Sequence, residues 1–185
     1  MTGVGLGQAV FLDRDGVLNH PVIREGNVQS PRTLDELSII QSSIEACNIL
    51  SEAGLKLIGV TNQPDISRGK VSREFIETIN DEITLQMGLD MLLYCPHDDS
   101  DDCHCRKPKS GMLLDGAKAF DIDLSASIMV GDRAKDIDAG LSAGCQTVFI
   151  DLGYDTPHPK GADYTAPDLR HAVPWILNTV NERKG

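Results

Sequence analysis

Two carboxylates, one residue apart, follow a short apolar run near the start of the chain. Residues 9–12 are apolar, Asp13 and Asp15 come directly after them, and Gly16 beyond allows a turn. In open α/β sheets ligands bind at the carboxyl ends of strands, so this order places acid groups where chemistry takes place. A buried strand with an ordinary polar turn is the alternative, because Asp and Gly are common turn residues.

Polar residues also follow two other predicted strands. Thr61 and Asn62 come after one apolar run and Asp132 after another, and Arg106 and Lys107 lie between these two sites in the sequence. Strand ends converge in a parallel sheet, so we expect these groups and the Asp pair to surround one point. Carboxylates suit Mg²⁺, and hydroxyl and ammonium donors suit a departing phosphate, so the set favours phosphoryl transfer with Mg²⁺.

Apolar runs alternate with helical patterns, which predicts a doubly wound, Rossmann-like parallel sheet flanked by helices. The predicted strands are 9–12, 55–60, 91–94, 127–130 and 146–150. The predicted helices are 42–53 with a Ser42–Glu45 capping box, one after the N-cap Ser72 that extends to Met87, 111–120, 134–143, and a tail helix that begins near Pro174. The predicted loops are 20–41, with a short strand at 37–40, and 151–168.

Length and composition limit the class of protein. The 185 residues suit one domain, 1–185, and the 41% apolar and 24% charged content is typical of globular proteins. Only 4% of residues are aromatic and the net charge is −11, which argues against a nucleic-acid partner. Residues 1–8 contain no basic group and no long apolar segment, so we expect no secretory signal, no membrane anchor and cytoplasmic residence.

Three of the five cysteines cluster with a histidine in a segment, about 95–105, that has little apolar content. The four potential ligands are Cys95, His97, Cys103 and Cys105. Their types and spacing predict a structural zinc, which would fix the neighbouring Arg106 and Lys107; free surface thiols are the alternative. With four protein ligands this zinc would have no position left for catalysis. The remaining Cys47 and Cys145 are predicted to be buried thiols.

Four motifs occur in a fixed order between residue 10 and about residue 150. They are Asp13-x-Asp15-Gly16-Val17-Leu18-Asn19, Thr61-Asn62-Gln63, Arg106-Lys107-Pro108 and Gly131-Asp132-Arg133-x-x-Asp136. This order resembles the haloacid dehalogenase superfamily of phosphohydrolases. The cysteine-rich segment is similar to that of the small, capless branch acting on D-glycero-D-manno-heptose 1,7-bisphosphate or histidinol phosphate. Its loop between His97 and Cys103 is shorter and more acidic than expected for the heptose branch.

The resemblance implies a mechanism in two steps. Asp13 would attack phosphorus to form an aspartyl phosphate, and Asp15 would protonate the leaving oxygen and then activate water. Mg²⁺ would be held by the carboxylates of Asp13 and Asp132 and the backbone carbonyl of Asp15. The phosphate-binding and substrate-binding residues would be Thr61, Asn62, Arg106 and Lys107.

Two of these residues have a structural alternative. Arg106 would reach a second phosphate or a substrate hydroxyl, although a surface ion pair is the plainer interpretation. Asp136, one helical turn after Asp132, would orient Lys107 or the metal site, whereas an exposed Asp in the first turn of a helix is equally consistent with the sequence.

The favoured hypothesis is therefore a Mg²⁺-dependent phosphomonoesterase for a small sugar phosphate, with heptose 1,7-bisphosphate ahead of histidinol phosphate. No large cap fits before Thr61, so loops 20–34, 64–71 and 97–110 would select the substrate. They carry Arg24, Arg32, Arg68 and Arg106, which favours an anion with more than one charge. A non-catalytic zinc-stabilised module or a receiver-like domain is the alternative of another class, and Asp15 argues against both. No nucleic-acid or membrane partner is expected, and a small capless domain can act as a monomer.

Overall fold

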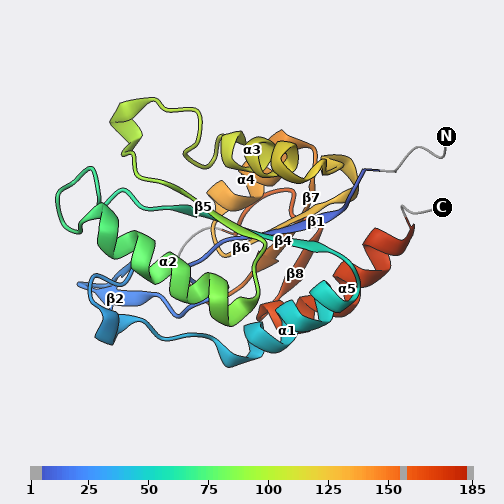
Figure 1. The fold of residues 1–185 in the computed structure, drawn as a ribbon, viewed down its shortest axis with the longest axis horizontal. Helices are drawn as coiled ribbons and strands as arrows, with labels where there is room; N and C mark the ends of the chain where they lie inside the picture. Colours follow the sequence, from blue (N-terminus) through green and yellow to red (C-terminus); the bar gives the residue numbers. More distant parts are fainter. Residues whose placement is uncertain (1–5, 155–157, 183–185) are drawn as a thin grey trace.

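A six-stranded parallel sheet forms the centre of the molecule (Figure 1), in a computed structural model that describes residues 6–154 and 158–182. In spatial order its strands are β5 (Met91–Cys95), β4 (Lys56–Asn62), β1 (Ala9–Leu12), β6 (Ile128–Gly131), β7 (Gln146–Ile150) and β8 (Tyr164–Ala166). The chain order reverses direction at β1, between β4 and β6. This is the switch point at which doubly wound sheets bind ligands.

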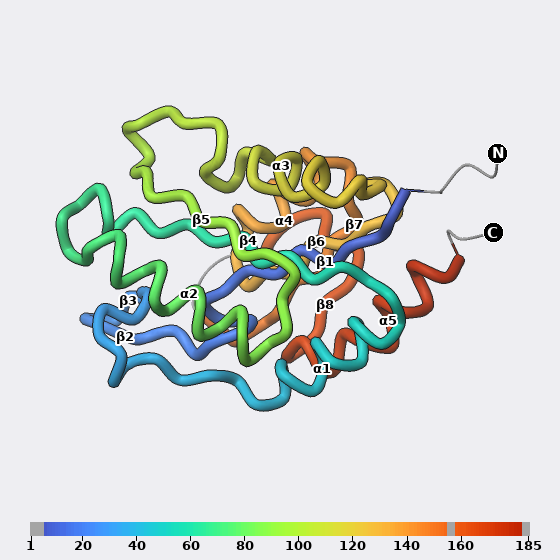
Figure 2. Tube along the Cα trace, viewed as in Figure 1, coloured from blue at the N-terminus to red at the C-terminus, as the bar shows by residue number. Residues whose placement is uncertain are grey.

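Helices cover both faces of the sheet (Figures 1 and 2), which confirms the predicted fold class. One face packs against α1 (Gln41–Glu52), α2 (Arg73–Met87) and α5 (Leu169–Glu182), and the other against α3 (Gly111–Phe120) and α4 (Ala134–Ala143). Side chains of β1 alternate between the two cores, with Val10 on one side and Phe11 on the other. The central strand is therefore buried on both faces, as its apolar run predicts.

The segment predicted as a loop over 20–41 contains a β-hairpin, so the loop prediction is wrong there. Strands β2 (Val22–Arg24) and β3 (Asn27–Gln29) pair antiparallel. The two central turn residues, Glu25 and Gly26, both have positive φ, as in a type I′ turn. Glu-Gly is a weaker hairpin signal than Asn-Gly, which is why the sequence did not reveal it. The short strand expected at 37–40 is reduced to a single bridge from Ile39.

The helix starts differ from expectation at two places. No side chain caps α1: the helix begins at Gln41 with Ile40 at its N-cap position, so Ser42 lies inside the helix and the predicted Ser42 capping box is wrong. The Ser72 N-cap of α2 is confirmed, because its side chain accepts from the backbone N–H of Phe75.

The chain after β7 holds more regular structure than predicted. Strand β8 lies within the expected loop 151–168, while residues 155–157, including Pro157, lie outside the described residues. Helix α5 begins at Leu169 rather than near Pro174, because the Asp168 carboxylate accepts from the backbone N–H of His171 and starts the helix earlier. In the described part of the chain, no helix combines the length and apolar character that a membrane crossing requires.

Candidate active site

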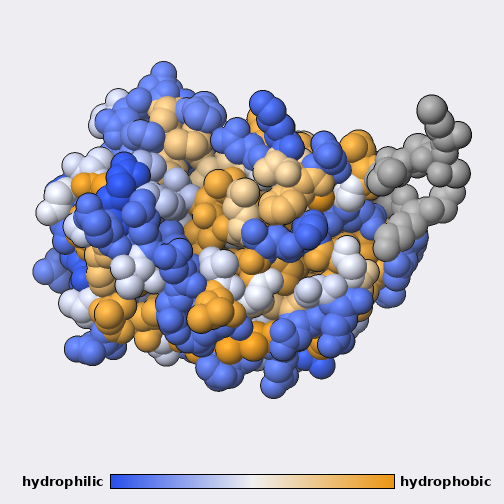
Figure 3. Space-filling model, in the orientation of Figure 1, coloured by the Kyte–Doolittle hydropathy of each residue, from blue (hydrophilic) through white to orange (hydrophobic). Residues whose placement is uncertain are grey.

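The carboxyl ends of β1, β4 and β6 open into a cavity of about 370 Å³. Its polar lining comes from these strand ends, from β3 and the loops after β3 and β4, from the segment before α3 and from the start of α4. Seven of the eight predicted catalytic, substrate-binding and magnesium-site residues line it: Asp13, Asp15, Thr61, Asn62, Arg106, Lys107 and Asp132. The end of the molecule where β2 and the loop before α2 lie is mostly hydrophilic on the face shown in Figure 3.

Lys107 lies between two carboxylates beneath the cavity. Its Nζ is 2.6 Å from Asp13 Oδ1 and 2.7 Å from Asp136 Oδ1, and it also donates to the carbonyl of Val60 at 2.7 Å. Burial opposes the charge on Lys107, but Asp13 and Asp136 outweigh it and raise the pKa of the ammonium. Asp136 is fully buried, so the exposed alternative for it is wrong and its predicted contact with Lys107 is present.

Asp132 is a buried carboxylate whose one ion pair is a long contact, 3.9 Å from Oδ2 to Arg133 Nε, among the residues that the structure describes. It is 3% exposed, and neither carboxylate oxygen accepts a hydrogen bond from the described residues. Burial, followed by the charges of Asp13 and Asp136, raises its pKa well above the usual value. A buried carboxylate is costly unless a cation or donor compensates it, so these oxygens fit a divalent cation.

The backbone around these carboxylates leaves no room for side chains. A Cβ on Gly16, which has φ +99°, would lie 2.4 Å from Asp132 Oδ2, and a Cβ on Gly131 would lie 2.2 Å from the Cβ of Asp136. Gly16 therefore allows the turn after β1 to approach Asp132, and Gly131 allows the end of β6 to approach the first turn of α4. Carboxylate oxygens of Asp13, Asp132 and Asp136 lie within 4.8 Å of one another as a result.

The excess of carboxylates predicts how stability depends on pH. Burial raises the pKa of Asp13 to about 6, so the folded state binds a proton more tightly than the unfolded chain between about pH 4 and pH 6. The free energy of unfolding should therefore decrease as pH rises through this interval in magnesium-free buffer. Asp13→Asn removes one titrating group, so the free energy of unfolding of this variant should decrease less with rising pH. The decrease that remains would come from Asp132, whose pKa is also raised.

Thermal unfolding of the wild type and Asp13→Asn between pH 4.5 and 7.5 measures this effect. Asp81→Asn, an exposed carboxylate in α2, is the matched control and should follow the wild-type curve. A wild-type curve parallel to that of Asp13→Asn would contradict the raised pKa.

Asp15 is turned toward four donors. Its carboxylate accepts from Ser30 Oγ at 2.7 Å, Gln63 Nε2 at 3.0 Å, Asn19 Nδ2 at 3.0 Å and Arg14 Nη2 at 3.0 Å. Burial alone would raise the pKa of Asp15, but the Arg14 guanidinium and the hydrogen bonds from Ser30 and Asn19 outweigh it and hold the pKa below its usual value. In the free protein Asp15 is therefore a carboxylate.

The two polar residues at the end of β4 have different surroundings. Thr61 Oγ1 accepts from Gln63 Nε2 at 2.9 Å, which leaves its own hydrogen available to a ligand. The Asn62 amide is engaged with the backbone of Lys107: Nδ2 donates to its carbonyl at 2.9 Å, and Oδ1 accepts from its N–H at 3.0 Å. The Asn62 side chain thus fixes the position of Lys107, and phosphate binding by Asn62 stays a prediction.

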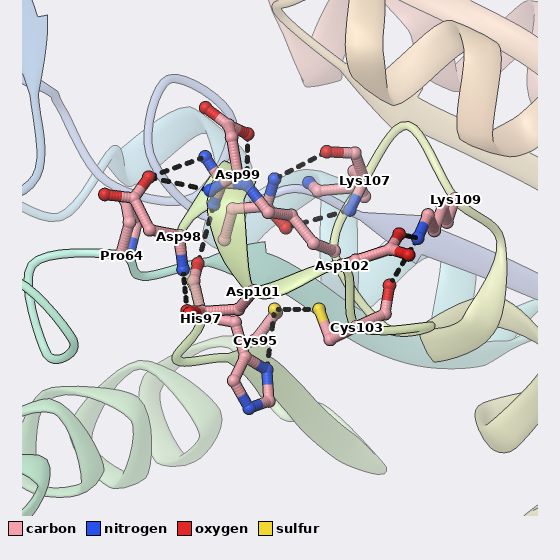
Figure 4. A network of polar contacts seen from close by, with 12 residues as sticks. Pro64, Cys95, His97, Asp98, Asp99, Asp101, Asp102, Cys103, Lys107 and Lys109 are labelled. Atoms are coloured by element: carbon pink, nitrogen blue, oxygen red, sulfur yellow. Dashed lines mark hydrogen bonds and ion pairs between the residues drawn. The ribbon is translucent and has the colours of Figure 1, made fainter.

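The four predicted zinc ligands converge, and their ligand atoms lie within 4.8 Å of one another. Figure 4 shows three of them, Cys95, His97 and Cys103. Cys95 Sγ is 3.5 Å from Cys103 Sγ, 3.2 Å from Cys105 Sγ and 3.6 Å from His97 Nδ1. Tetrahedral zinc with Zn–S near 2.3 Å requires ligand separations of about 3.7 Å, so small adjustments would complete the site. Cys47 and Cys145 are buried elsewhere, as predicted.

Arginine contacts join the zinc-ligand segment to the cavity wall. Arg106 Nε is 2.6 Å from Asp99 Oδ1, and its Nη1 donates to the carbonyl of His97 at 3.0 Å. Arg68 forms two 2.6 Å hydrogen bonds to the Asp98 carboxylate. Arg106 therefore forms the ion pair that the sequence analysis gave as the alternative to substrate binding. It also lines the cavity, so both interpretations of Arg106 are compatible with the structure.

The predicted selecting arginines do not all reach the cavity. Arg32 lines it and pairs with Asp65 at 2.8 Å, whereas Arg24 pairs with Glu36 outside the lining. Arg133 and Lys135 line the cavity from the start of α4, although the sequence analysis assigned them no role. Their position next to Asp132 and Asp136 was the available signal.

Arg14 and Ser30 are further residues that the sequence analysis missed. Arg14 is fully buried and donates to Asn80 Oδ1 of α2 at 2.9 Å as well as to Asp15. Ser30 reaches Asp15 only because the unpredicted hairpin folds over the cavity. Gln63, by contrast, was part of a recognised motif, and its amide links Asp15 with Thr61.

Three comparisons with known proteins agree with this geometry. A HAD-hydrolase-like family model matches residues 104–172. The D-glycero-β-D-manno-heptose-1,7-bisphosphate 7-phosphatase of Yersinia pestis is 34% identical over 184 residues, covering 93% of this chain and 90% of that protein. The enzyme of the same name from Haemophilus influenzae is 39% identical over 149 residues, covering 75% of this chain and 78% of that protein. The crystal structure of D,D-heptose 1,7-bisphosphate phosphatase from B. bronchiseptica, complexed with magnesium and phosphate, has a TM-score of 0.78 at 29% identity. The match covers 92% of this chain and 98% of that one.

Proposed function

This chain belongs to the family of HAD-like phosphatases that includes the heptose-1,7-bisphosphate 7-phosphatases, and from this premise we propose that it hydrolyses a sugar bisphosphate through a phosphorylated Asp13. The observation that carries the proposal is the ion pair of Lys107 with Asp13 at the sheet's switch point, beside Asp132, whose buried carboxylate oxygens accept no hydrogen bond from the described residues. Membership of a phosphatase family sets aside the non-catalytic and receiver-like interpretations. Cytoplasmic residence, a monomeric state and a single domain stay predictions.

In the first step, an Asp13 carboxylate oxygen attacks phosphorus and the bond to the sugar oxygen breaks. Lys107 is bonded to Asp13 and is fixed by Asp136, the Val60 carbonyl and Asn62, so its ammonium can turn one N–H from Asp13 to a phosphoryl oxygen while the other contacts keep it in place. The Thr61 hydroxyl donates to another phosphoryl oxygen. These groups orient the phosphate for attack and offset its charge in the transition state.

Asp15 transfers the protons. In the free protein its pKa is low, so it must take up a proton when the phosphate arrives, and the negative charge of that phosphate favours this uptake. It then protonates the departing sugar oxygen, and as a carboxylate it removes a proton from the water that hydrolyses the aspartyl phosphate. Arg14, Ser30 and Gln63 hold its carboxylate and limit its orientations.

Two metals fit the donor sets. Asp13 and Asp132, with the carbonyl of Asp15, would hold Mg²⁺, whose chemistry in such a site is to neutralise the nucleophile and polarise the phosphoryl group. The B. bronchiseptica relative was crystallised with magnesium and phosphate. The site formed by Cys95, His97, Cys103 and Cys105 would hold a structural Zn²⁺.

The charges of the cavity support a substrate with two phosphates. Its lining holds seven cationic side chains, Arg32, Arg68, Lys70, Arg106, Lys107, Arg133 and Lys135, against four carboxylates, Asp13, Asp15, Asp65 and Asp132. The chain as a whole has a net charge of −11, so the cavity reverses the overall sign. The relatives' names point to heptose 1,7-bisphosphate, whereas histidinol phosphate has a single phosphate and an amine that these cations would repel.

The test is a comparison of kcat/KM for heptose 1,7-bisphosphate and histidinol phosphate in Mg²⁺, with an aryl phosphate as reference. We expect a preference of at least about tenfold for the bisphosphate, or about 1.4 kcal/mol of transition-state binding. If the enzyme hydrolyses the aryl phosphate but has equal, poor activity on the other two substrates, the proposed reaction stands and the proposed substrate is wrong. No Mg²⁺-dependent release of phosphate from any of the three would overturn the proposed reaction.

A further inference from the structure

Lys135 differs from the other cations of the cavity because it has no anionic partner. Five of them lie within 4.0 Å of a carboxylate at the cavity or on the zinc-ligand segment, and Arg133 lies 3.9 Å from Asp132. Among the described residues 6–154 and 158–182, no carboxylate lies within ion-pair distance of Lys135 and no hydrogen bond involves its ammonium. The cavity therefore contains one uncommitted positive charge.

The surroundings of Lys135 make an unpaired charge unfavourable. The side chain is half-buried at the start of α4, and burial lowers its pKa; the charges of Lys107 and Arg133 act in the same direction and outweigh, together with burial, the opposing charges of Asp136 and Asp13. The positive end of the α4 dipole adds to this local potential. An anion bound next to Lys135 would relieve the repulsion between these positive groups. The ion pair would form in partly desolvated surroundings, where ion pairs are stronger than in water.

Lys135 is not part of the ion-pair group around the nucleophile. It forms no ion pair with Asp13 or Asp136, which are bonded to Lys107. Lys135 and Arg106 both line the cavity, and the pKa of Asp99, whose carboxylate is bonded to Arg106, is lowered first by that arginine and further by Lys135. Neither Lys135 nor Arg106 forms an ion pair with the nucleophile.

We propose that Lys135 binds the second, non-reacting phosphate of a bisphosphorylated substrate and so determines specificity for it. This inference rests on the proposed function and adds a residue that neither the motifs nor the ion pairs indicated. Lys135 contributes to substrate binding and not to the chemical step. Its loss should therefore raise KM for the bisphosphate and leave kcat at saturation close to that of the wild type.

The experiment compares Lys135→Met, Lys135→Arg and the wild type on heptose 1,7-bisphosphate and on an aryl phosphate that has no second anion. Lys135→Met should lower kcat/KM for the bisphosphate by about 10- to 100-fold, which is the loss expected for one charge-assisted hydrogen bond. For the aryl phosphate we expect less than about a threefold change, and Lys135→Arg should recover most of the bisphosphate activity. Lys118→Met removes an exposed lysine from α3 and controls for net charge.

The possible results separate this inference from the function on which it rests. If Lys135→Met lowers kcat/KM equally for both substrates, or for neither, the proposed role of Lys135 is overturned. The proposed function still holds in that case if the wild type prefers the bisphosphate. An equal loss in Lys118→Met would reduce the effect to net charge and also overturn it. A wild-type enzyme that does not prefer the bisphosphate over the aryl phosphate overturns the distal phosphate site and the substrate together.

Discussion

Asp13→Asn is expected to lower kcat by at least about 10⁴-fold, because an amide cannot form the phosphorylated intermediate. The substitution keeps the size of the side chain and leaves Lys107 paired with Asp136 at 2.7 Å. It also removes one of three buried carboxylates that lie together, two of which share the ammonium of Lys107. The fold should therefore persist, with a melting temperature at pH 7 in magnesium-free buffer equal to or above that of the wild type.

Steady-state release of phosphate from an aryl phosphate, together with thermal unfolding, measures both effects. Asp81→Asn, on the exposed face of α2, is the matched control and should retain wild-type turnover. Incubation of the wild type with substrate, followed by acid quenching, should trap phosphate on the protein, and Asp13→Asn should trap none. Turnover within about a hundredfold of the wild type would assign the nucleophile to another residue.

Local patterns were enough to predict most of the regular structure. The helices over 111–120 and 134–143 and the strand over 146–150 have the bounds expected from their apolar periodicity and terminal glycines. An error lies where a distant contact outweighs a local signal: β8 pairs with β7 across a proline-containing segment. Sequence spacing carries no information about such partners.

The site divides in the same way. Residues directly after strands, such as Asp13 and Asp132, could be placed because parallel strand ends meet at one edge of the sheet. The donors to Asp15 could not be placed, since Ser30 arrives from a hairpin and Arg14 is anchored by Asn80, which is 66 residues away. The low pKa of Asp15 follows from these donors and was therefore unavailable to sequence reasoning.

One expected consequence of the zinc site needs refinement. Zinc was predicted to fix both Arg106 and Lys107, yet Lys107 is held independently by Asn62, Asp13, Asp136 and Val60. Arg106 depends on the zinc-ligand segment itself, through the carbonyl of His97 and the carboxylate of Asp99. Zinc should therefore control substrate recognition more strongly than the chemical step.

Cys105→Ala tests this division. We expect its zinc content to fall from near one equivalent to below about a tenth, because three remaining ligands hold the metal poorly. Losing the ordered Arg106 wall should lower kcat/KM for the bisphosphate by about 100-fold or more, whereas kcat on an aryl phosphate should fall much less. The melting temperature should also decrease, since metal binding and folding of the loop are coupled.

Cys145→Ala is the matched control, because it removes a buried thiol outside the cluster and should keep full zinc content. If Cys105→Ala does not fold, stripping wild-type zinc with a chelator and restoring it, with Mg²⁺ present throughout, gives the same comparison. Equal losses on both substrates would mean that zinc also positions Lys107, despite the four contacts that hold it. A purified wild type with less than about a tenth of an equivalent of zinc and full activity would show that the cysteines act without a metal.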